Sequence, residues 1–291
     1  MLALWALFLL SAMIISWALN INTRLALSGN ANRMLEAEAL ACSGSEIAMH
    51  PQINAGSPYL HRKIDNLHSY DAQITGEGGR LNLNWLMAGE DPARADILRR
   101  YLANKKIDLN ERNAMLDCLL DWVDPDDLER LNGAEATDDY QPPNAPITRV
   151  DELKRVKNWR DFTSQPHWDD DFTVNSSGPV DLAWASRDVL VALPGITPDM
   201  AERYLAMRRG PDGIDGTADD RPFASIEEVR AALGLTQEQF QQLAPLVSFK
   251  DPVVRIVSVG KASSVTRVVQ MVIRRPGNGN MVPQLISWKE F

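Results

Sequence analysis

Hydrophobic positions are concentrated at the start of the chain. Residues 1–19 read MLALWALFLLSAMIISWAL and carry no charge. As a helix this segment would be roughly 28 Å long at about 1.5 Å per residue, which is enough to cross a bilayer core. No Lys or Arg precedes Arg24, and the small-residue cleavage site of a secretory signal peptide is missing. The pattern favours an uncleaved membrane anchor, with contacts assigned to Leu2, Trp5, Leu7, Leu10, Ile14 and Trp17.

After the anchor, apolar residues recur among polar ones at helical spacing, so we expect one N-terminal helix over residues 1–50, apolar first and amphipathic afterwards. The segment 51–84 contains YDAQITGEGGRLNLNWL, in which two short alternating stretches flank a glycine cluster. This pattern predicts a β-hairpin. The apolar positions of the amphipathic part are Leu25, Met34, Leu35, Ala39, Leu40, Ile47 and Ala48.

From 85 to 246 the pattern is helical, with short elements. NERNAMLDCLLDWVDP predicts a helix that begins at the N-cap Asn110 and stops before Pro125. Acidic and proline-rich loops follow, around a short helix near RVDELKRV. The tail, 247–291, returns to strands, which read VVRIVSV, SSVTRVVQMVIRR and, after a PGNGN turn, MVPQLISW.

The order of these stretches predicts the fold class. A helix, strands, a large helical block and further strands need only one sheet if the helical block is an insertion. We therefore expect an α+β fold, in which a long N-terminal helix packs on a small antiparallel sheet. A large all-α domain over residues 85–246 would be inserted between the strands of that sheet.

Within the helical block, residues 181–246 predict four short helices, with capping side chains at Thr197, Ser225 and Thr236. DNA-binding helix-hairpin-helix modules use a Gly-hydrophobic-Gly turn and hold a phosphate on backbone amides. Here the turn reads GITP, and Pro198 removes one of those amides. Residues 181–250 contain 7 Lys plus Arg and 11 Asp plus Glu, a net charge of −4 where a phosphate binder needs a positive surface. We interpret the unit as a packing motif.

Charge over the whole chain gives the same indication. The 291 residues include 30 Lys plus Arg and 39 Asp plus Glu, a formal net charge of −9, which disfavours a nucleic-acid partner. Cys42 and Cys118 have neither CxxC nor metal spacing, so buried thiols are favoured and a long-range disulfide is left open. The four histidines lack zinc spacing and no catalytic motif occurs, so no enzyme activity is expected.

A turn that reads GPDGIDGTADDRPF gathers four aspartates: Asp212, Asp215, Asp219 and Asp220. Close carboxylates repel one another unless a cation offsets their charge, and calcium prefers hard oxygen ligands. The spacing is not that of an EF-hand. We interpret the turn as a candidate calcium site, with a solvated acidic turn as the alternative. A weaker candidate is the loop that carries Asp124, Asp126, Asp127 and Glu135.

These features together resemble the minor pseudopilin K family of type II secretion. The resemblance covers nearly the whole chain and rests on the apolar N-terminal segment, GGRLNLNWL, LLDWVDPDD followed by NGAE and Tyr140, PNAP before a DEL helix, ALPGIT, and the glycine–aspartate turn before PFASIEEV. LLDWVDPDD with GAE is the most specific of these motifs.

The resemblance implies a pilin-like fold with an inserted α-domain, and a place at the tip of a periplasmic pseudopilus. It implies an inner-membrane anchor with the bulk of the chain in the periplasm, minor pseudopilins I and J as partners through the N-terminal helices, and calcium in the helical domain. Family members also have a leader cut by prepilin peptidase; none precedes Met1 here, which indicates a mature form or a truncated start. Trp5 stands where most pilins carry a glutamate, and the K pseudopilin typically lacks that glutamate.

Two other classes of protein share part of this sequence pattern. A membrane-anchored DNA receptor of the competence type also combines one anchor with a helical hairpin, but the acidic balance and the GITP turn argue against it. A metal-dependent hydrolase could use the aspartate clusters, but no base or nucleophile can be named for it.

Overall fold

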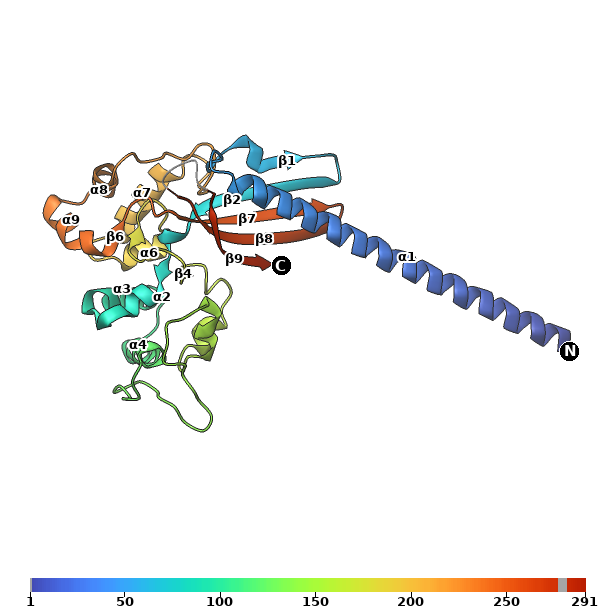
Figure 1. The fold of residues 1–291 in the computed structure, drawn as a ribbon, viewed down its shortest axis with the longest axis horizontal. Coiled ribbons are helices and arrows are strands. Elements are labelled where there is room, and N and C mark those ends of the chain that lie inside the picture. The colour runs from blue at the N-terminus through green and yellow to red at the C-terminus, as the bar shows by residue number, and fades with distance from the viewer. Residues whose placement is uncertain (1, 277–281) are drawn as a thin grey trace.

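The N-terminal helix is one continuous element. The computed structural model describes residues 2–276 and 282–291, apart from the side chains of residues 2, 22, 23, 25 and 26. Helix α1, Leu2–Met49, runs from the N-terminus into the globular part and projects far beyond it (Figure 1). The predicted helix over residues 1–50 is confirmed within the described residues.

A five-stranded antiparallel sheet lies against the C-terminal half of α1. The strand order is β1-β2-β7-β8-β9, and α1 packs over β2, β7 and β8. Buried side chains of helix and sheet, among them Ala41, Ala48, Ile256 and Met271, form a small core between them. The strands are β1 His61–Lys63, β2 His68–Gly76, β7 Val253–Ala262, β8 Val265–Arg274 and β9 Gln284–Glu290, and a short 3-10 helix at Pro58–Leu60 precedes β1.

The helical region is inserted between two neighbouring strands. β2 and β7 pair along their full lengths, with Gly76 opposite Val254, and everything between them lies in one lobe at the end of the sheet away from the projecting helix (Figure 1). The predicted α+β architecture with an inserted helical region is confirmed. The α-helices of the lobe are α2 Leu83–Met87, α3 Pro92–Asn104, α4 Leu109–Val123, α5 Arg160–Thr163, α6 Arg187–Ala192, α7 Pro198–Arg208, α8 Ile226–Leu233 and α9 Gln237–Leu243.

Two short parallel strand pairs hold the ends of the inserted lobe together. β3 Leu81–Asn82 pairs with β4 Phe172–Thr173, and β5 Val180–Asp181 pairs with β6 Val247–Ser248. A large aromatic and aliphatic core fills the lobe, with Trp122, Trp159, Tyr101, Tyr204 and Phe172 fully buried. Short 3-10 helices complete the lobe at Glu77–Gly79, Ala88–Glu90, Val150–Arg155 and Ala244–Leu246.

The hairpin predicted around the glycine cluster is wrong. β2 already pairs with β1 on one side and β7 on the other, so its hydrogen-bonding groups are occupied. Glu77–Gly79 forms a 3-10 turn, which sends the chain into the inserted lobe instead of back along β2. The glycines serve close packing here, because a Cβ on Gly76 or Gly79 would overlap Trp184.

Helix boundaries were predicted with mixed success. The N-cap of α4 is Asp108, whose carboxylate accepts hydrogen bonds from the amides of residues 110 and 111, so Asn110 is not the cap. Thr197, Ser225 and Thr236 cap α7, α8 and α9 through their hydroxyls, as predicted. The three C-terminal strands are confirmed, and residues 277–281 of the predicted turn and last strand lie outside the described residues. Both cysteines are free thiols.

Candidate functional site

The apolar end of α1 is exposed along its whole length. Residues 3–21 form the one described helix that is long and apolar enough to span a membrane, and none of that segment is buried within the protein. Such a surface requires lipid or partner helices as its surroundings. The side chain of Leu2 lies outside the described residues, whereas the other predicted anchor residues are 57–68% exposed: Trp5, Leu7, Leu10, Ile14 and Trp17.

The C-terminal half of α1 docks on the sheet through small residues. Ala37, Ala41 and Ala48 are completely buried, whereas Leu35, one of the larger apolar residues of the predicted amphipathic part, is 65% exposed. Small side chains bring the helix backbone close to the strands, and a Cβ on Gly260 of β7 would overlap the backbone of α1. The larger apolar residues of this half are therefore left for other contacts.

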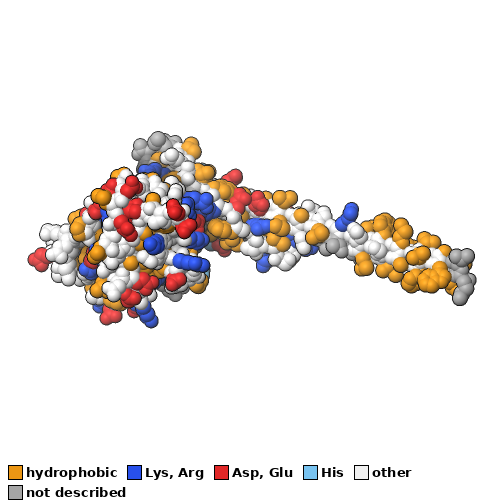
Figure 2. Space-filling view, turned by 90° about the horizontal axis from the view of Figure 1, so that it is seen from below, with side chains coloured by type: hydrophobic (Ala, Val, Ile, Leu, Met, Phe, Trp, Pro, Cys, Tyr) orange, Lys and Arg blue, Asp and Glu red, His pale blue; other side chains and the backbone are white. Residues whose placement is uncertain are grey.

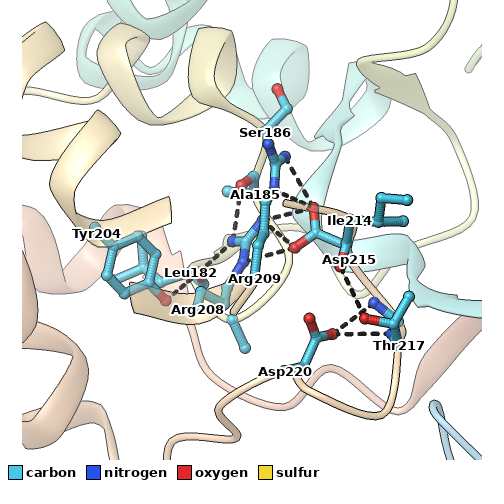
Figure 3. A network of polar contacts seen from close by, with 12 residues as sticks. Leu182, Ala185, Ser186, Tyr204, Arg208, Arg209, Ile214, Asp215, Thr217 and Asp220 are labelled. Carbon is cyan, nitrogen blue, oxygen red and sulfur yellow. Dashed lines mark hydrogen bonds and ion pairs between the residues drawn. The ribbon is translucent and has the colours of Figure 1, made fainter. Parts of the chain in front are cut away.

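The aspartate turn between α7 and α8 is organised by arginines. Asp215 accepts hydrogen bonds from Arg208 at 2.9 and 3.0 Å and from Arg209 at 2.9 Å (Figure 3). Arg208 is 4% exposed and also donates to the carbonyl oxygen of Ala185 at 2.9 Å. The sequence predicts that a metal ion offsets the negative charge of Asp215. In the structure, the guanidinium groups of Arg208 and Arg209 supply positive charge there.

The other three aspartates of the turn bind its backbone. Asp212 accepts from the amide of Ile214, and Asp219 accepts from the amide of Asp212. One oxygen of Asp220 accepts from the amide of Gly216 at 2.6 Å, while its other oxygen is buried without a hydrogen-bond partner. Burial and the nearby carboxylates of Asp215 and Asp212 raise the pKa of Asp220.

The same turn joins the inserted lobe to the sheet. The side-chain amide of Gln73 on β2 donates to the carbonyl oxygen of Asp215 at 2.5 Å, and the amide of Gly56 donates to the carbonyl oxygen of Gly216 at 3.0 Å. Gly216 has a positive φ and lies directly on the backbone of Ile74. The turn is therefore a bridge between the two parts of the molecule.

The second acidic loop surrounds Arg130. Its guanidinium donates to Asp124, to Asp121 at 2.6 Å and to Glu90 at 2.7 Å. Asp126 and Asp127, the other two aspartates predicted here, accept hydrogen bonds from the amide of residue 128 and from the side chain of residue 144.

Glu135 lies in the same loop without a partner. Both of its carboxylate oxygens are buried and have no hydrogen bond, and one oxygen each of Asp124 and Asn144 is in the same situation. Burial, and then the charges of Asp121 and Asp124, raise the pKa of Glu135. Four buried oxygens without a donor are costly unless a proton or a cation reaches them.

Sequence reasoning missed Asp121 and Asn144. Asp121 is completely buried on α4 and accepts the amide of Ala134 at 2.8 Å, which fixes the loop against the helix. A charged residue on the apolar face of the helix LLDWV was the available signal. As they stand, the described side chains include no group of three or more His, Cys, Asp or Glu residues that could hold a metal ion.

Comparisons with known proteins agree with the fold. Residues 79–165 match the family model described as type II secretion system (T2SS), protein K. A chain of the crystal structure of the GspK-GspI-GspJ complex from the type 2 secretion system of enterotoxigenic Escherichia coli is similar with a TM-score of 0.59 and 12% sequence identity. The likeness covers 94% of this chain and 98% of that chain. No curated protein matches the chain.

A long N-terminal helix on an antiparallel sheet, exposed and apolar at its free end, is a pilin-like architecture. Within the inserted lobe, residues 79–165 match the protein K family of type II secretion, and the fold is shared with a chain of the secretion complex. The resemblance to the protein K family inferred from the sequence is confirmed over residues 79–165.

Proposed function

We propose that this chain caps the pseudopilus and promotes its assembly, without enzymatic activity. The observation that carries the proposal is the shape of the molecule: a thin apolar helix leaves one end of the sheet, and the bulky inserted lobe lies at the other end (Figures 1 and 2). With α1 in the inner membrane and the globular part in the periplasm, the lobe stands where a further subunit would be added.

The choice of partners rests on the similar solved complex, whose components are GspK, GspI and GspJ. We propose that the corresponding minor pseudopilins I and J pack against α1 of this chain. The first acidic residue of the sequence is Glu36, so the anchor carries no carboxylate to pair with a neighbour's amine. A subunit at the tip has no neighbour above it whose amine could pair with such a carboxylate. An unpaired carboxylate in a bilayer is costly, so its absence fits a place at the tip.

The test is assembly of the full-length chain with its host's minor pseudopilins I and J, co-expressed and purified in mild detergent. We expect a stoichiometric ternary complex from the wild type and its loss in Ile14→Asp, because a charge in the apolar segment disfavours both lipid and helix packing. Leu128→Asp, at a 76% exposed position in the inserted lobe, is the matched control and should assemble normally.

Two results would count against the proposal. If the Ile14→Asp variant still forms the ternary complex, the apolar segment of α1 is not needed for binding of the partners. Absence of a complex with wild-type protein would favour the DNA-receptor alternative. A DNA titration at low and high salt then tests that alternative, since phosphate binding weakens steeply with salt.

We further propose that calcium stabilises the inserted lobe at the loop of Asp124 and Glu135. Calcium takes six to eight hard oxygens, and the unpartnered oxygens of Glu135, Asp124 and Asn144 are of that kind. This support favours the second loop over the turn 212–220, where Asp220 alone keeps an unpartnered oxygen. Calcium at the aspartate turn stays a prediction.

Calcium at a hundredfold excess over its Kd is expected to add about 2.7 kcal/mol to the free energy of unfolding, measured by urea titration. Glu135→Gln should abolish the increment, whereas Asp219→Asn should retain it. The increment should shrink as pH falls, because the raised pKa of Glu135 lets protons compete with the cation. If Asp219→Asn abolishes the increment and Glu135→Gln retains it, calcium binds at the aspartate turn instead. If calcium adds nothing to the free energy of unfolding of the wild type or of either variant, the calcium proposal is wrong.

A further inference from the structure

The two edges of the sheet differ in length and chemistry. β1 is a three-residue edge whose residues His61, Arg62 and Lys63 are all exposed, which is how natural sheets discourage pairing with another chain. β9 at the opposite edge is seven residues long, and no strand of the described chain pairs with its outer side. Its outward N–H and C=O groups form a long edge open to a further strand.

Apolar side chains line this edge beside α1. Leu285 and Trp288 are 50% and 38% exposed, and their partners on β8, Ile273 and Met271, belong to the core under α1. Cross-strand neighbours point to the same face of a sheet, so Leu285 and Trp288 extend that core beyond the cover of the helix. On the other face, Lys289 forms an ion pair with the inserted lobe.

Three glutamates flank the same surface. Glu38 and Glu46 on α1 and Glu290 on β9 all act on the thiol of Cys42, whose pKa is raised by burial and then by these carboxylates. The indole of Trp288 donates to Glu290 at 2.7 Å, which holds the ring beside the acid. Figure 2 shows acidic and hydrophobic side chains mixed where α1 enters the globular part.

We propose that β9 accepts an extended segment of a neighbouring minor pseudopilin as a sixth strand, with a basic residue of that segment facing Glu38, Glu46 and Glu290. An open edge selects a strand rather than a helix, because a strand satisfies its backbone groups. A second copy of this chain is a poorer occupant, since it would bring the same three glutamates to the contact. The inference rests on the proposed function, because the partner is a subunit of the same pseudopilus.

Backbone hydrogen exchange of the full-length chain in detergent, alone and with minor pseudopilins I and J, tests the strand directly. We expect slower exchange across residues 284–290 in the complex and no change at residues 61–63. Complex formation without protection of 284–290 overturns the proposal and leaves the proposed function standing. Absence of any complex with wild-type protein would instead contradict the proposed function.

Side-chain variants test the chemistry of the surface. Leu285→Asp and, separately, Glu290→Lys are each expected to weaken binding of the partners about tenfold. Leu67→Asp, at a 55% exposed position in the turn between β1 and β2, and Glu227→Lys on α8 are the matched controls and should bind as the wild type does. If Leu285→Asp does not fold, Glu290→Lys decides. The proposal is overturned if the folded variants bind the partners with wild-type affinity. It is also overturned if the variants lose self-association of this chain but keep partner binding.

Discussion

Glu77→Ala is expected to lower the free energy of unfolding by about 3–5 kcal/mol, because it leaves two largely buried arginines without their counter-ion. Glu77 is completely buried and accepts two hydrogen bonds from Arg255 on β7, at 2.8 and 2.9 Å. Arg80 and Thr173 of the inserted lobe also donate to it, at 3.2 and 2.5 Å. The carboxylate therefore ties the sheet to the lobe at the point where the chain leaves β2.

The pH dependence of the effect follows from the pKa of Glu77. Burial alone would raise this pKa, but the charges of Arg255 and Arg80 outweigh burial and hold it below its ordinary value of 4.5. A lowered folded-state pKa gives stability that is present above pH 4.5 and lost as pH falls through the folded value. The difference between wild type and Glu77→Ala should therefore narrow in acid.

Urea titration of the full chain in detergent, at neutral pH and below pH 4.5, measures both effects. Asp96→Ala is the control, since Asp96 pairs with Arg100 at half-exposed positions and its loss should cost at most about 1 kcal/mol. Equal effects of the two substitutions would mean that the Glu77 network does not join the lobe to the sheet.

Local patterns were sufficient for most of the fold. The apolar run and the helical spacing after it predicted α1, and alternation of apolar residues predicted β7, β8 and β9. Hydroxyl caps at Thr197, Ser225 and Thr236 were readable because a cap binds an amide three residues away. The insertion followed from the order of these elements.

Contacts between residues far apart in the sequence could not be predicted from local patterns. Glu77 meets Arg255 across the whole inserted lobe, and Gly76 and Gly79 on either side of it pack on Trp184 instead of turning a hairpin. Asp215 was assigned to a cation by local charge, but nothing local indicates that Arg208 and Arg209 face it. The residues that pack α1 on the sheet were predicted only in part, because Ala37 and Ala41 are buried there as well as the predicted Ala48.

Close packing at Gly260 is the basis of the second large effect. Gly260→Leu is expected to lower the free energy of unfolding by about 3 kcal/mol, near the upper end for overpacked sites. A Cβ at this position would overlap the carbonyl oxygen of Ala37 and the backbone nitrogen of Ala41. Neither backbone atom can rotate away as a side chain would, so the helix has to move off the sheet.

The matched control is Gly29→Leu on the exposed part of α1, where no atom lies within 4 Å of an added Cβ. That substitution should stabilise the helix slightly, because glycine costs about 1 kcal/mol in a helix interior relative to good helix formers. Urea titration gives the two free energies, and hydrogen exchange of residues 37–48 locates the change. If Gly260→Leu keeps wild-type stability and wild-type exchange of those amides, α1 is not held on the sheet by close backbone contact. Loss of protection confined to α1 would instead show that the helix can detach while both other parts of the molecule stay folded.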